Sequence, residues 1–144
     1  VLIGARDARK VMRKLADRSA GVVLGTLTPT ARVADLELPA KLAEAGVPFC
    51  FAGRPDQLRV SAALAVRHGL SRDAAHAALT RTPATMMGQE ASVGALRQGC
   101  SADFVVFKGD LLDLSARHVA TWIDGVRVCG RQPEQPRDLA EDRR

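Results

Sequence analysis

Two short apolar segments between helix-like segments constrain most strongly how this chain folds. Residues 22–24 (Val-Val-Leu) and 47–51 (Val-Pro-Phe-Cys-Phe) each follow a glycine. Runs this short cannot form a helix, and unbroken apolar character is typical of strands buried on both faces. Residues 5–18 and 38–45 show the apolar spacing of amphipathic helices. This strand–helix order with short connections predicts parallel βαβ units in an α/β fold.

The middle of the chain predicts three further helices. Ser71 is placed to cap the second of them, because its hydroxyl can accept from the free amides of the first turn. Thr82 and Pro83 form a second start signal, with the threonine as cap and the proline at the first helical position. The helices are expected over residues 56–68, 71–79 and 83–87, after a loop over residues 26–34.

After Gly88 the pattern changes to strands and turns. Residues 104–107 (Phe-Val-Val-Phe) predict a strand, and residues 119–128 predict a hairpin that turns at Asp124-Gly125. Residues 131–144 combine many charges with two prolines and no apolar periodicity, which predicts a flexible charged tail. At the other end, residues 1–4 have the character of a strand interior, so we expect the chain to be part of a longer protein.

Composition narrows the classes of partner. Aromatic residues make up 3% of the 144 residues, which removes the stacking surfaces that single-stranded nucleic acids need. The net charge of +5 comes from dispersed residues such as Arg59 and Arg67, which we interpret as solvated helix faces. The apolar runs are far shorter than the ~20 residues of a membrane span. We therefore expect neither a nucleic-acid nor a membrane partner.

The spacing of the three cysteines indicates whether they form disulfides, bind a metal or remain reduced. Cys50, Cys100 and Cys129 fit neither a disulfide framework nor a Cys-x-x-Cys metal site. We expect reduced thiols, which favours a cytoplasmic setting. Cys50 lies inside an apolar strand without a neighbouring cation, so it is interpreted as an inert buried thiol and not as a nucleophile.

The most specific pattern lies near the carboxyl end. It comprises residues 93–107 (VGALRQGCSADFVVF), Gly109-Asp110 and residues 122–128 (WIDGVRV), preceded by the helical residues 65–71 and by residues 42–49 (LAEAGVPF). In this order and spacing, the segments resemble the carboxyl-terminal part of the amidohydrolase superfamily, especially its imidazolonepropionase-like branch. The resemblance extends over residues 1–128.

The resemblance implies a metal-dependent hydrolase of C–N bonds in cyclic amides and imides. It implies the last βα units of a (β/α)8 TIM-type barrel over residues 1–90 and strands of a small β-sandwich over residues 91–130. In such proteins zinc or another divalent metal is held by a His-x-His pair, a carboxylated lysine or a glutamate, two further histidines, and an aspartate after the last barrel strand. That aspartate polarises or deprotonates a metal-bound water.

This chain departs from that ligand pattern. It has three histidines, none in a His-x-His pair, and residues 52–55 (Ala-Gly-Arg-Pro) follow the expected last strand. We therefore expect no metal and no cofactor in this chain. Asp56 is the nearest carboxylate and is interpreted either as a displaced catalytic ligand or as a cap of the next helix. Arg54 is a candidate anion contact, because barrel ligands bind at the carboxyl ends of strands.

The remaining polar candidates have structural interpretations. His68 precedes a glycine at a helix end, where a cation favours the helix dipole. His76 lies in an alanine-rich helix and His118 in a connection between strands. Asp103 is expected to organise a turn or strand entry and not to take part in the chemistry.

Three hypotheses follow from the sequence. The first is a carboxyl-terminal portion of an amidohydrolase-like protein that is inactive alone. The second is a non-catalytic binding protein in which Arg54 binds a small anionic ligand. The third is an assembly role, in which the chain pairs with the amino-terminal remainder of the barrel or with itself, because a partial barrel exposes strand edges.

Overall fold

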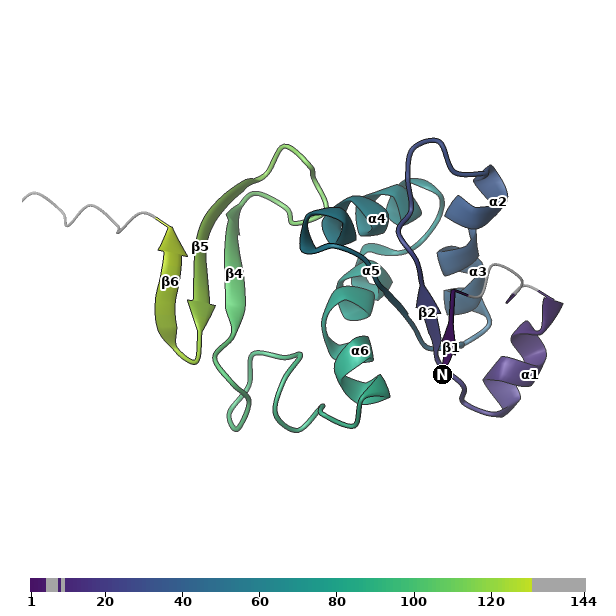
Figure 1. Ribbon diagram of the computed structural model, residues 1–144, viewed down its shortest axis with the longest axis horizontal. Coiled ribbons are helices and arrows are strands. Elements are labelled where there is room, and N and C mark those ends of the chain that lie inside the picture. Colours follow the sequence, from purple (N-terminus) through teal and green to yellow (C-terminus); the bar gives the residue numbers. More distant parts are fainter. Residues whose placement is uncertain (5–7, 9, 131–144) are drawn as a thin grey trace, which may run out of the picture.

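The computed structural model describes residues 1–4, 8 and 10–130 (Figure 1). The first three strands form a parallel sheet in the order β1-β2-β3, with Val23 paired with Cys50. This confirms the predicted parallel arrangement, although β3 is shorter than the expected residues 47–51. The strands are β1 (Leu2–Ile3), β2 (Val22–Leu24) and β3 (Phe49–Phe51).

Helices connect the parallel strands. Among the described residues the first helix is α1 (Met12–Asp17), which lies within the predicted residues 5–18. Residues 5–7 and 9 of that prediction lie outside the described part of the chain. Two helices lie between β2 and β3, namely α2 (Val33–Leu36) and α3 (Leu38–Glu44). The predicted loop over residues 26–34 therefore ends early. Four helical residues are too few to show a helical period, so α2 could not be predicted from apolar spacing.

Three helices follow β3, as expected, in α4 (Pro55–Arg67), α5 (Arg72–Leu79) and α6 (Arg81–Met86). Ser71 caps α5, since its hydroxyl accepts from the Ala74 N–H at 3.2 Å. The predicted start of the third helix is wrong, because its N-cap residue is Thr80 and Thr82 lies inside the helix. Pro83 is the third helical residue, a position whose N–H has no partner within the helix.

The last strands form an antiparallel sheet in the order β4-β5-β6, from β4 (Phe104–Lys108), β5 (Arg117–Ile123) and β6 (Val126–Gly130). The predicted hairpin is confirmed. Asp124 and Gly125 have φ of 50° and 74°, the left-handed values of a two-residue type I′ turn. His118 lies in β5 and not in a connection, because this strand begins two residues before the expected range.

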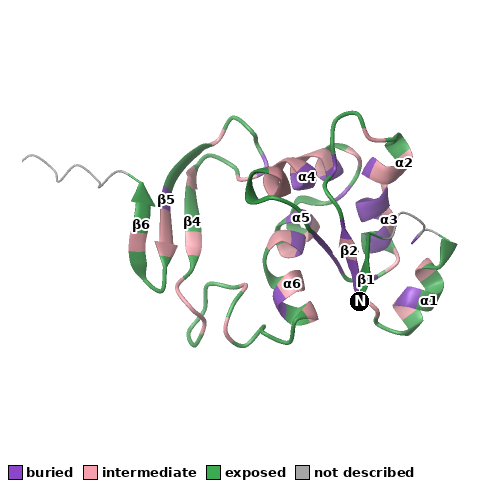
Figure 2. Ribbon diagram, viewed as in Figure 1, coloured by how far each residue is buried: buried purple, intermediate pink, exposed green. Residues whose placement is uncertain are grey.

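The hydrophobic core lies around the parallel sheet (Figure 2). Val22 and Leu42 have no exposed surface. Three alanines of the helices are also fully buried, because their small side chains allow close packing, namely Ala62, Ala65 and Ala75. In the antiparallel sheet only Ala120 is buried. The packed interior therefore lies mainly between the parallel sheet and the helices, and not in the antiparallel sheet.

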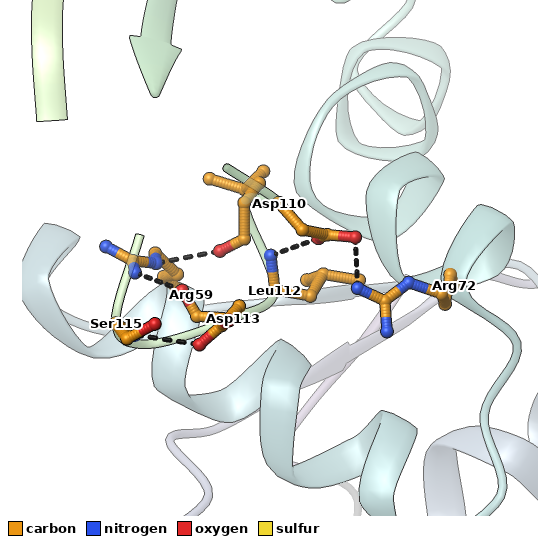
Figure 3. A network of polar contacts seen from close by, with 7 residues as sticks. Arg59, Arg72, Asp110, Leu112, Asp113 and Ser115 are labelled. Carbon is orange, nitrogen blue, oxygen red and sulfur yellow. Dashed lines mark hydrogen bonds and ion pairs between the residues drawn. The ribbon is translucent and has the colours of Figure 1, made fainter. Parts of the chain in front are cut away.

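The connection between β4 and β5 ties the antiparallel sheet to the helices. Arg59 of α4 donates to the carbonyl oxygens of Leu111, Asp113 and Ala116 at 2.7, 2.6 and 3.1 Å. Figure 3 shows Arg59 beside Asp113 of this connection. Arg72 of α5 pairs with Asp110 in the same connection. The predicted domain boundary near residue 90 stays a prediction, and the predicted tail over 131–144 lies outside the described residues.

No helix in the described part of the chain has both the length and the apolar character to cross a bilayer.

Candidate functional site at the carboxyl edge of the parallel sheet

A hollow of about 630 Å³ lies where β1 and β2 end. Gly4, which follows β1, and Leu24 to Thr28 at the end of β2 form one side, and the start of α2 forms the other. Parallel strands bring their carboxyl ends to one edge, and α/β proteins bind ligands at that edge. The sequence placed its candidate site at the same edge of the sheet, but after β3 and not after β1 and β2.

Hydroxyl groups supply much of the polar surface of this hollow. Thr28 and Thr30 lie with their hydroxyl oxygens 3.2 Å apart, and the Thr26 hydroxyl donates to the side-chain oxygen of Gln57 at 3.3 Å. A side chain on Gly53 would lie 2.4 Å from the Thr26 hydroxyl oxygen. Glycine at this position therefore allows the segment after β3 to approach the segment after β2.

The arginine and the aspartate that line the hollow bind each other. The Arg32 guanidinium binds both oxygens of Asp35, at 2.9 and 3.1 Å. A two-point contact of this kind fixes both side chains and offsets the charge of each. The hollow thus offers hydroxyl donors and acceptors beside a neutralised ion pair.

The sequence-predicted Arg54 and Asp56 do not line this hollow. They follow Gly53, which approaches Thr26 of the lining. Arg54 is the N-cap residue of α4, and its Nε and Nη2 atoms donate to the Asp56 carboxylate at 3.1 and 3.4 Å. The structure corrects the expectation that Asp56 caps α4, because no side chain caps this helix and Asp56 lies in its first turn. Pairing with Asp56 offsets the charge with which Arg54 would attract an anion.

The residues present do not fit a catalytic divalent metal. In residues 1–4, 8 and 10–130, no group of three or more histidine, cysteine, aspartate or glutamate side chains could hold an ion. A catalytic zinc needs about three such ligands. The histidines are dispersed: His68 ends α4, His76 lies in α5, and His118 in β5 has its Nε2 atom 2.8 Å from the Thr121 hydroxyl.

Cys50 and Asp103 have the structural positions expected for them. Cys50 is 7% exposed, and burial raises the pKa of its thiol, which suppresses the nucleophilic thiolate. Asp103 accepts the Asp124 N–H at 2.6 Å, so it holds the turn of the β5–β6 hairpin. All three cysteines are free.

Sequence reasoning singled out none of the residues that line the hollow. It treated residues 26–34 as a loop without a function, although the structure places Thr26, Thr28, Thr30 and Arg32 there. The signal that was available is positional. A loop that directly follows a buried parallel strand opens at the ligand-binding edge of the sheet.

Known proteins resemble this chain in sequence and in structure. The family model described as amidohydrolase family matches residues 37–129. Amidohydrolase tasK of Hapsidospora irregularis is 38% identical over 66 residues, which cover 46% of this chain and 7% of that protein.

Two solved structures extend the comparison. An amidohydrolase from Thermotoga maritima MSB8 superposes with a TM-score of 0.80 and 30% identity over 90% of this chain. A second crystal structure of an amidohydrolase has a TM-score of 0.71 at 18% identity over 86% of this chain, a likeness of fold alone. The chain spans only 36% and 38% of the length of these two proteins.

Proposed function

This chain belongs to the amidohydrolase family, and from that premise we propose that it forms the carboxyl-terminal part of a C–N hydrolase barrel. Three adjacent parallel strands with helices between them support a (β/α)8 origin for residues 1–90. The exposed faces of the antiparallel sheet support a role for residues 91–130 in a β-sandwich that other strands complete. The imidazolonepropionase-like branch remains our choice within the family, on the motif of residues 93–107 and 122–128.

We propose further that the chain alone does not hydrolyse amides through a metal. The observation that carries this proposal is the end of β3, where Gly53 and Arg54 stand in place of a carboxylate ligand and the nearest acid, Asp56, is paired with the arginine. A guanidinium at this point repels a divalent cation and cannot lose its proton to become a ligand.

Metal analysis and an activity assay on the same preparation test this proposal. The purified 144-residue chain is incubated with zinc and freed of excess ion. It is then assayed for ring opening of a cyclic imide and a cyclic amide. We expect zinc well below one equivalent and no turnover above a zinc-only blank. Stoichiometric zinc together with turnover that Asp56→Asn abolishes would contradict the proposal.

The partners that this role requires are the amino-terminal remainder of the barrel or a second copy of the chain. The outer edge of β1 supports this proposal, since Leu2 and Ile3 are 42% and 81% exposed. Unpaired strand edges with apolar side chains favour association with another strand.

A further inference from the structure

A second hollow, of about 700 Å³, lies at the opposite edge of the parallel sheet. It is bordered by Gly21 and Pro48, which precede β2 and β3, and by residues of α6. Figure 1 shows the starting ends of these strands between α1 and α6. This hollow is separate from the carboxyl edge discussed above, and its volume suits a small organic molecule.

Two arginine side chains give the second hollow a positive charge. Arg18, which follows α1, and Arg81, which begins α6, both line it and are both exposed. Within the described part of the chain, neither guanidinium has a hydrogen-bond or ion-pair partner, and no carboxylate lines the hollow. Arg32 and Arg54 differ in this respect, since each binds a neighbouring aspartate.

Hydroxyl groups accompany the two arginines. Ser19, Thr82 and Thr85 line the same hollow. Ser19 has φ of 48°, a left-handed conformation that is uncommon outside glycine, and it directs the chain from α1 towards β2. Guanidinium N–H groups and hydroxyls together are the donors that proteins use for phosphate and carboxylate oxygens.

The wall of the second hollow has an apolar part. A side chain on Gly21 would lie 2.6 Å from the terminal methyl carbon of Met86, so the methionine packs directly on the glycine backbone. Pro48 lies beside them in the same lining. A flexible methionine and a proline suit an apolar group of irregular shape.

We infer that this second hollow binds a small organic anion, a phosphate or carboxylate carried on an apolar body. Arg18 and Arg81 bind the anionic group, and Met86 contacts the apolar body. The inference goes beyond the proposed function, because it concerns the amino edge of the sheet and requires neither a metal nor hydrolysis.

A titration of the isotope-labelled 144-residue chain with phenyl phosphate, followed by nuclear magnetic resonance, tests the inference. We expect shifts of the amide signals of residues 18–21 and 81–86, weakening as salt concentration rises. Benzyl alcohol tests whether the anion is needed, benzoate whether a carboxylate suffices, and inorganic phosphate whether the apolar body contributes. Equal binding of benzyl alcohol, or shifts concentrated in residues 24–35, would overturn the inference.

Substitutions that remove one positive charge test whether each arginine contributes to the binding of phenyl phosphate. Arg18→Gln and Arg81→Gln should each raise the dissociation constant of phenyl phosphate at least about fivefold. Arg67→Gln, an exposed arginine of α4, is the matched control and should leave it unchanged. Unchanged affinity in the doubly substituted chain refutes the inference. Lysine at either position keeps the charge and should retain binding, which separates loss of the ligand contact from loss of the fold.

Discussion

At the scale of single residues, Arg59 connects the two halves of the molecule. Its guanidinium donates to three carbonyl oxygens that lie 52 to 57 residues further along the chain, and it lies 4.8 Å from the centre of the Phe107 ring. In the sequence Arg59 resembles the other dispersed arginines, and we interpreted it as part of a solvated helix face. Nothing local distinguishes it, because its partners are backbone atoms of a distant loop.

Replacing Arg59 by lysine should destabilise the fold. A lysine ammonium is a point charge that cannot satisfy three separate carbonyls with the planar geometry of a guanidinium. We expect the free energy of unfolding to fall by about 1–3 kcal/mol. Urea denaturation measures this change. Arg67→Lys in the same helix is the control and should shift the midpoint little. Equal effects of the two substitutions would show that the Arg59 contacts contribute nothing.

Two aspartates in the connection between β4 and β5 make the contact of this connection with the helices dependent on pH. The pKa of Asp110 lies below its ordinary value, first because the Leu112 N–H donates to it and next because Arg72 pairs with it. The Ser115 N–H likewise lowers the pKa of Asp113. A lowered folded-state pKa means stabilisation that is present above the ordinary pKa and is lost as pH falls through the folded value.

As the pH falls below the ordinary carboxyl pKa of about 4 and through the lower folded-state values, the connection between β4 and β5 should therefore open locally more often. Hydrogen-exchange protection factors of the Leu112 and Ser115 amides measure it, and both should fall between pH 6 and pH 3. In the doubly substituted chain, Asp110→Asn with Asp113→Asn, the acid-dependent part should disappear. Protection that stays constant in the unsubstituted chain argues against this account.

At the scale of elements, the segment between α6 and β4 depends on one glycine. A side chain on Gly94 would lie 2.7 Å from the Ala84 methyl carbon and 3.0 Å from the Thr80 carbonyl oxygen, and its φ is +87°. The segment therefore contacts α6 through bare backbone. Gly88 has a similar φ of +67° but nothing within 4 Å of the position of an added side chain.

Comparing Gly94→Ala with Gly88→Ala separates two roles of glycine, which are to adopt a left-handed conformation and to allow close contact with a neighbouring helix. Both substitutions place alanine in a left-handed conformation, which costs about 1–2 kcal/mol. Gly94→Ala also forces the segment away from α6, and overpacking of this kind adds about 1–3 kcal/mol. We expect a distinctly lower thermal midpoint for Gly94→Ala than for Gly88→Ala, measured by circular dichroism. Similar midpoints would mean that the segment moves away without cost.

At the scale of the whole molecule, the packed core and the exposed strands lie in different places. The core surrounds the parallel sheet, whereas the β1 edge and most of the antiparallel sheet are exposed (Figure 2). Large apolar side chains are exposed on both, including Ile3, Val105, Ile123 and Val126. Apolar surface on strands that have free edges is prone to association.

The purified chain should therefore self-associate as its concentration rises. Ile3 is 81% exposed on the edge strand β1, and Ile3→Lys should shift the equilibrium towards the monomer, because a lysine on an edge strand opposes pairing. Leu114→Lys is the matched control, since Leu114 is 55% exposed in a connection and not in a strand. Sedimentation velocity over a range of concentrations measures both. A monomer at every concentration argues against the proposed partners.

Local patterns in the amino-acid sequence predicted the order and type of most helices and strands. Short apolar runs, the Ser71 cap and the Asp124-Gly125 turn act over a few neighbouring residues, so β2, α5 and the β5–β6 hairpin were predictable, as was the family. The start of α6 was not predictable in this way, because no side chain caps this helix. Its N-cap residue, Thr80, directs its hydroxyl to the His76 carbonyl oxygen of the preceding helix.

Which polar groups lie close together depends on the folded chain and not on local sequence. Arg59, which binds the carbonyls of the β4–β5 connection, and the arginines of the second hollow were alike in the sequence as dispersed charges. Arg54 was singled out as an anion contact, but its pairing with Asp56 was not foreseen. Their roles depend on partners that the fold brings together or keeps away. Hydrogen bonds and ion pairs act over a few ångströms in space, whatever the separation along the chain, so no local pattern encodes them.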